Sequence, residues 1–95
     1  MKMIVCVLTL RLHVPWVHSL KEKRMEVKSL LAKLRNKFNI AAAEADEQDS
    51  HAFIVIQTVA LAADNAQADS IMDNVLSFVE ANTEAEIFSV ERERR

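Results

Sequence analysis

Hydrophobic and polar residues alternate along residues 3–13, and this pattern predicts a β-strand. One face of the alternation is wholly apolar and consists of Ile4, Cys6, Leu8, Leu10 and Leu12. The other face begins apolar and turns polar toward Arg11 and His13. A period of two residues is that of a strand, so we expect one fully buried face, with Cys6 in the core. Pro15 ends the run because proline lacks the backbone N–H that a strand ladder needs.

Two later segments carry apolar residues at helical spacing, and each begins with a capping signal. Ser19 is followed three residues on by Glu22, and Asp64 is followed at the same distance by Gln67. Such pairs form a capping box, in which the two side chains satisfy backbone N–H groups at the start of a helix. We therefore predict helices over residues 19–38 and 64–82.

Three further strands are predicted, at residues 40–46, 52–62 and 86–92. In the last of them Phe88 and Val90 are expected to point inward, and the charged tail 91–95 is expected to fray. The resulting order, β-α-β-β-α-β, predicts an α+β fold of the ferredoxin-like kind. In this fold a four-stranded antiparallel sheet carries two helices on one face. We expect a single domain over residues 1–95.

The composition is typical of a small globular protein in a reducing compartment. Hydrophobic residues make up 51% of the 95 residues, enough for one core without disulfides. Cys6 is the single cysteine and has no partner for an internal bridge. No run approaches the roughly 20 apolar residues that span a bilayer. The apolar stretch 3–10 is followed at once by Arg11, without a signal-peptide cleavage site. We expect a cytoplasmic protein with no membrane partner.

The chain contains no glycine, and this excludes two classes of nucleotide site. Phosphate-binding loops of the P-loop and dinucleotide types need glycine because the backbone must approach the phosphate closely. No pair of His or Cys residues has the close spacing that fixes two metal ligands on one element. We expect neither a cofactor nor a resident metal.

Charge is segregated along the chain although the net charge is only −2. Residues 20–38 carry seven Lys or Arg against two Glu, whereas residues 39–90 carry ten Asp or Glu and no Lys or Arg. Five cations of the first helix are candidates for binding a polyanion: Lys21, Lys23, Arg24, Lys28 and Arg35. Such a stripe suits a phosphate backbone and makes binding salt-dependent. A solvated helix face, or a contact with the acidic part of a second subunit, has the same pattern.

The predicted topology brings four segments to one edge: the end of the first strand, the start of the first helix, the middle hairpin and the start of the last strand. Besides Lys21, Lys23 and Arg24, this polar rim collects His13, Trp16, His18, Glu44, Asp46, Asp49 and His51. Lys23 lies within the apolar stripe of its helix, so we expect its stem to point toward the sheet. Its ammonium then pairs with Glu44 or Asp46, binds an anion, or passes the sheet edge into water.

The rim also admits an enzymatic interpretation. His13, Lys23 and Asp46 would then converge on a small ligand, with or without a metal ion. A polar loop rim has the same composition, because Asp in a hairpin turn commonly bonds the local backbone. Trp16, beside Pro15, either covers the end of the core or contacts a partner, and exposure of its ring would favour the contact.

Five short segments, spread over nearly the whole chain, together form a specific pattern. They are S-L-K-E-K-R at 19–24, R-N-K-F-N at 35–39, A-E-A-D-E-Q-D at 43–49, F-V-E at 78–80 and V-E-R-E at 90–93. The pattern resembles the YlxP-like bacterial family, a domain of unknown function. This resemblance implies a ferredoxin-like fold. Genes of the family often lie among those for transcription and translation factors, which implies a role linked to RNA or the ribosome.

The chain departs from that family after Asp49. The family usually continues with a stretch like Leu-Trp-Gln-Arg-Ala, whereas the matching positions here are Ser50, His51, Ala52, Phe53 and Ile54. Gln57 replaces a glycine that is usual in the third strand. If the Trp-Gln-Arg stretch carries the family's function, this protein has changed or lost it.

The second face of the sheet is expected to be uncovered and partly apolar. Its apolar residues include Val5, Val7, Val59 and Leu61, and a homodimer that pairs two such faces would cover them. Base stacking is not expected there, since Phe53 is its one aromatic residue in this prediction. Our leading hypothesis is a non-enzymatic, dimeric module that binds RNA or a ribosomal component through the helix 19–38 and the rim. A purely structural homodimer subunit is a further alternative.

Overall fold

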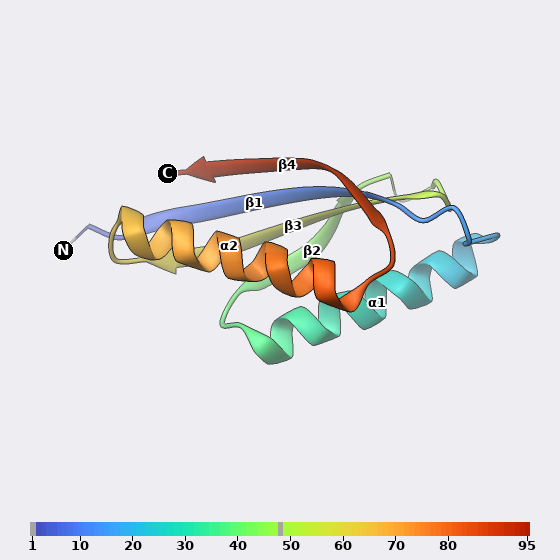
Figure 1. Cartoon of the computed structure of the whole chain (residues 1–95), viewed down its shortest axis with the longest axis horizontal. Coiled ribbons are helices and arrows are strands. Elements are labelled where there is room, and N and C mark those ends of the chain that lie inside the picture. The colour runs from blue at the N-terminus through green and yellow to red at the C-terminus, as the bar shows by residue number, and fades with distance from the viewer. Residues whose placement is uncertain (1, 48) are drawn as a thin grey trace.

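Four strands and two helices follow one another in the order predicted from the sequence. The structure is a computed structural model that describes residues 2–47 and 49–95. Its elements are β1 (Ile4–His13), α1 (Leu20–Lys37), β2 (Ala41–Asp46), β3 (Phe53–Ala62), α2 (Asn65–Asn82) and β4 (Glu86–Arg94). All strand pairs are antiparallel, and the sheet order is β2-β3-β1-β4. Figure 1 shows both helices against one face of this sheet. The chain has the ferredoxin-like α+β fold.

The core lies between the helices and the face of the sheet that they cover. On β1 the alternate side chains of Cys6, Leu8, Leu10 and Leu12 are buried, as the alternation predicted. The other elements contribute Leu30, Leu31, Leu34, Ile54, Ile56, Met72, Val75 and Val79 to the same cluster. Each large aliphatic side chain buried in this way stabilises the fold by about 1.5–3 kcal/mol. Cys6 is part of this packing.

Both helices begin at the capping residues that the sequence predicted. The Ser19 hydroxyl accepts a hydrogen bond of 3.1 Å from the N–H of Glu22. At the second helix, Asp64 Oδ1 accepts one of 2.8 Å from the N–H of Gln67. These caps fix where α1 and α2 start along the sheet. Neither helix combines the length and apolar character that a bilayer crossing demands.

The C-terminal tail is paired with the sheet, which corrects the prediction that residues 91–95 fray. Strand β4 continues to Arg94. Beyond it, Arg95 and Val5 exchange two backbone hydrogen bonds of 2.8 and 2.9 Å. Arg92 and Arg94 also pair with Asp73 and Asp69 of α2. The charges of the tail are therefore used within the fold, which the high charge density alone did not indicate.

A β-bulge turns Phe88 to the uncovered face of the sheet, which corrects its predicted inward position. Leu12 pairs with Ile87 while its neighbour Arg11 pairs with Ser89, so Phe88 is the extra residue. Its side chain is 51% exposed, and its ring lies 5.9 Å from that of Phe53. Ile87 packs against the core in its place. A pattern of period two cannot reveal an inserted residue, because a bulge exchanges the two faces beyond it.

Candidate functional site

The segments of the predicted polar rim lie together at one end of the molecule. Figure 1 shows the end of β1, the start of α1 and the β2–β3 connection at that end. His51 Nδ1 lies 3.1 Å from the carbonyl oxygen of Val17, and the N–H of Val14 donates to the carbonyl of Ala52 over 2.8 Å. His18 is exposed, and its N–H donates to the Glu22 carboxylate. The rim is thus a connected region, held largely by backbone contacts.

Lys23 points into the protein and joins α1 to the β2–β3 connection. Its side chain is almost fully buried, with Nζ 3.0 Å from Oε2 of Glu44. The ammonium also donates to the backbone carbonyl of Glu47, a residue in the left-handed region with φ of 59°. Of the three roles predicted for Lys23, the structure shows the pairing with Glu44. Its ammonium is therefore separated from the surface cations of α1.

His13 does not converge with Lys23, and within the described residues Asp46 makes no ion pair with it. His13 stacks on Phe53 on the uncovered face, with ring centroids 4.9 Å apart, whereas Lys23 lies on the helix side of the sheet. A shallow depression beside the hairpin is lined by Asp46, Glu47, Asp49 and Ser50, without Lys23 or His13. Across residues 2–47 and 49–95, no three His, Cys, Asp or Glu residues are grouped as metal ligands. The enzymatic interpretation of His13, Lys23 and Asp46 therefore lacks a shared cavity.

Three of the predicted cations form an exposed row on α1. Lys21, Arg24 and Lys28 follow helical spacing and lie on one side of the helix, which we call the basic flank. The fourth, Arg35, is engaged within the fold, because its Nη2 donates to the Ala42 carbonyl of β2 over 2.5 Å. The basic flank thus lies on the side of α1 that faces the edge strand β2.

The arginines of β1 and β4, and Arg95 just after β4, differ from the basic flank in forming ion pairs. Ion pairs join Arg11 to Glu91, Arg92 to Asp73, Arg94 to Asp69 and Arg95 to Glu93. Within the part of the chain that the structure describes, no ion pair involves a residue of the basic flank. Its positive charge is therefore directed outward and is not offset by a carboxylate in contact with it.

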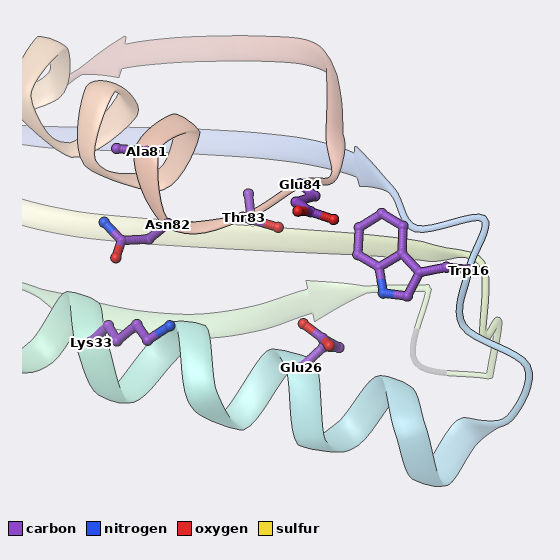
Figure 2. Close-up of a pocket in the computed structure, with 7 residues that line it drawn as sticks. All are labelled: Trp16, Glu26, Lys33, Ala81, Asn82, Thr83 and Glu84. Carbon is purple, nitrogen blue, oxygen red and sulfur yellow. The ribbon is translucent and has the colours of Figure 1, made fainter.

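A groove that the sequence did not predict lies between α1 and the C-terminal end of α2. Figure 2 shows its lining residues, which are Trp16, Glu26, Lys33, Ala81, Asn82, Thr83 and Glu84, and its volume is about 460 Å³. Beneath it is a recess of about 30 Å³ whose walls include Leu12, Val14, Leu30 and Ile54 of the core. The single indication in the sequence was Trp16, a residue that is 38% exposed.

The uncovered face of the sheet is apolar at its two ends and polar in the middle. Leu61, 61% exposed, lies toward one end, and Phe53 and Phe88 lie toward the other. Between them Arg11 pairs with Glu91, and Gln57 donates to Thr9 over 3.2 Å. Val7 and Val55 belong to this face yet are buried by their neighbours. The face thus carries more aromatic surface, and less aliphatic surface, than the sequence predicted.

Comparison with known proteins gives two related matches. The family described as "Protein of unknown function (DUF503)" matches residues 5–92. A protein of Bacillus subtilis (strain 168) described as "Uncharacterized protein YlxP" is 32% identical over 68 residues. That alignment covers 72% of this chain and 74% of the relative.

Proposed function

Because the chain belongs to the DUF503 family of YlxP-like proteins, whose function is unknown, we propose a function from its surface: a non-enzymatic module that binds RNA through the basic flank of α1. The observation that carries the proposal is the outward-facing row of Lys21, Arg24 and Lys28. In the described residues this row has no ion-paired carboxylate, whereas the strand arginines have one each. A row of this kind leaves its charge available to an external polyanion.

The dimensions of the basic flank suit a few phosphate contacts. From Lys21 to Lys28 the helix rises about 10 Å, at 1.5 Å per residue. Three Lys or Arg contacts to phosphate predict a slope of about −2 to −3 for log K against log[salt]. Binding of this size is moderate in strength and does not distinguish RNA sequences, because phosphate contacts carry no base information.

The aromatic residues of the sheet do not extend this interface. Phe53 and Phe88 lie on the uncovered face, and the helices lie against the opposite face (Figure 1). Bases that stacked on these rings would therefore be separated from the basic flank by the sheet. We propose contact with the sugar-phosphate backbone, and the context implied by the family resemblance makes ribosomal RNA the first RNA to test.

The test compares two triple variants that change the net charge equally. K21Q/R24Q/K28Q removes the basic flank, and R92Q/R94Q/R95Q removes three cations that the fold already neutralises. Binding is measured by fluorescence anisotropy with a labelled ribosomal RNA fragment at about 50 and 200 mM salt, the range over which phosphate contacts weaken strongly. We expect the first variant to lose binding and the second to keep it.

Two results would contradict the proposal. One is unchanged affinity of K21Q/R24Q/K28Q for the RNA fragment. The other is an equal loss in both triple variants, which would mean that net charge alone, not the basic flank, governs binding. Circular dichroism of both variants checks that the comparison is made between folded proteins.

A further inference from the structure

We propose that the groove between α1 and α2 is a binding site for a cationic nitrogen group, an alkylammonium or guanidinium. The site is separate from the basic flank, and its ligand is a cation whereas RNA is a polyanion. This inference therefore does not depend on RNA binding. The groove residues come from the β1–α1 connection, from α1, from the end of α2 and from the α2–β4 connection, which Figure 2 shows around one space.

Two carboxylates near Trp16 give this part of the groove its negative character. Figure 2 shows Glu26, on α1, and Glu84, after α2, on the side of the groove where the Trp16 ring lies. Among the ion pairs of the described chain, none involves either carboxylate. A ligand cation between them would meet two charge-assisted acceptors without displacing a partner inside the protein.

The end of helix α2 adds a further negative contribution. Ala81 and Asn82, its last residues, line the groove together with the C-cap Thr83. The C-terminus of a helix carries about half a negative charge, which favours a nearby cation. The last turn of α2 contains no basic residue to neutralise it. The helix terminus and the two carboxylates thus both favour a positively charged ligand.

The indole of Trp16 supplies the face on which such a cation would rest. A guanidinium or ammonium within about 6 Å of an indole ring is attracted by its π electrons. Trp16 is 38% exposed and lines the groove, so its indole is accessible to a ligand there. This partial exposure favours the contact role predicted for Trp16 over a purely covering one.

Lys33 sets the orientation of the ligand. It lies along α1 at the end of the groove away from Trp16, beside Asn82 (Figure 2). An ammonium there suits a carbonyl or carboxylate of the ligand, while the cation lies near Trp16. The small recess below, which has both apolar and polar walls, has room for about one water-sized group. The chemistry is that of an arginine or lysine side chain and its own carbonyl, either as a free molecule or within a peptide.

Trp16 also makes the site directly measurable. It is the single tryptophan and the chain has no tyrosine, so intrinsic fluorescence reports on this groove. The probes are Nα-acetyl-arginine amide, free arginine and agmatine, with Nα-acetyl-citrulline amide as an uncharged analogue of nearly the same shape. We expect a saturable change in Trp16 fluorescence with the arginine compounds and none with the citrulline compound.

Substitutions locate the site. E26Q and E84Q each remove one carboxylate and should raise the Kd for Nα-acetyl-arginine amide about tenfold, the weight of one charge-assisted hydrogen bond. E80Q is the matched control, because Glu80 is an exposed carboxylate of α2 outside the groove. It should leave the Kd unchanged. The variant K21Q/R24Q/K28Q should also bind the arginine compound normally, which separates this site from the RNA proposal.

The same titration distinguishes the source of the cation. Tighter binding of free arginine than of Nα-acetyl-arginine amide supports a free amino acid, whereas a clear preference for the amide supports a side chain of a partner peptide. Agmatine, which has no carbonyl, should bind more weakly than either. Equal responses to the citrulline compound, an effect of E80Q as large as that of E26Q, or no saturable response to any arginine compound would each overturn the proposal.

Discussion

Replacing Lys23 with methionine removes the ammonium that joins α1 to the β2–β3 connection. Methionine keeps the length and the apolar stem of the side chain, so the packing against the sheet is preserved. The substitution leaves Glu44 Oε2 without the ammonium 3.0 Å away, and it removes the donor to the Glu47 carbonyl. The expected effect is therefore that of an unpaired, mostly buried carboxylate, not that of a cavity.

The magnitude follows from the burial of the two partners. Breaking a buried ion pair by removing one partner typically costs about 3–5 kcal/mol of folding free energy. Glu44 Oε2 is buried, but the side chain as a whole retains 19% exposure, so part of it still contacts water and we expect about 2–3 kcal/mol. For a domain of this size each kcal/mol lowers the Tm by about 4–8 °C, which gives a decrease of roughly 10–20 °C. The double variant K23M/E44L removes both charges and should come within about 1 kcal/mol of the parent protein.

Urea unfolding measures these free energies. Far-UV circular dichroism and Trp16 fluorescence should give the same transition for the parent, K23M, E44L and K23M/E44L. The four free energies of unfolding form a double-mutant cycle, in which we expect a coupling of about 1.5 kcal/mol or more. K28M is the control for an exposed lysine of the same helix and should change stability by less than about 0.5 kcal/mol. A cost below about 1 kcal/mol for K23M, or additive single effects, would refute the reasoning.

Two further predictions concern the start of α1 and the uncovered face of the sheet. S19A removes the N-cap and should lower the free energy of unfolding by about 1 kcal/mol. S29A, on the exposed side of α1, is the control and should leave that free energy unchanged. Equal decreases of Tm in thermal melts of the two variants would contradict the capping role. We also expect two copies to pair through the uncovered face, so that L61E yields monomers by analytical ultracentrifugation. M25E places the same charge on exposed α1 surface and should leave the dimer intact, and a parent protein that is already monomeric would rule the dimer out.

The order of elements was predictable because each local signal agreed with the fold. The alternation on β1 and the two capping pairs are short-range features, and short-range features fix the limits of elements. The inward direction of Lys23 was also predictable, since its position within the apolar stripe determines where its stem points. The sequence predicts Glu44 or Asp46 as the partner of the Lys23 ammonium. In the register that β2 adopts, that partner is Glu44.

The groove and the outward position of Phe88 depend on tertiary structure. Glu26 and Glu84 belong to distant parts of the chain, and no spacing in the sequence indicates that they face the same cavity. Phe88 changes face because of one inserted residue, which leaves no mark in composition. In the sequence Arg35 is equivalent to the other cations of its helix. In the fold, β2 brings the Ala42 carbonyl within hydrogen-bonding distance of Arg35. In each case the outcome depends on how two elements pair or pack, which local spacing does not show.

The hydrogen bonds between Val5 and Arg95 bring both chain ends to the same extremity of the molecule. The start of α1 and the β2–β3 connection occupy the opposite extremity (Figure 1). A fusion tag or a biosensor tether attached at either terminus would consequently project away from the beginning of α1. Immobilised protein therefore presents the basic flank to solution, and a linker between the adjacent ends would give circular permutants that open at the far hairpin.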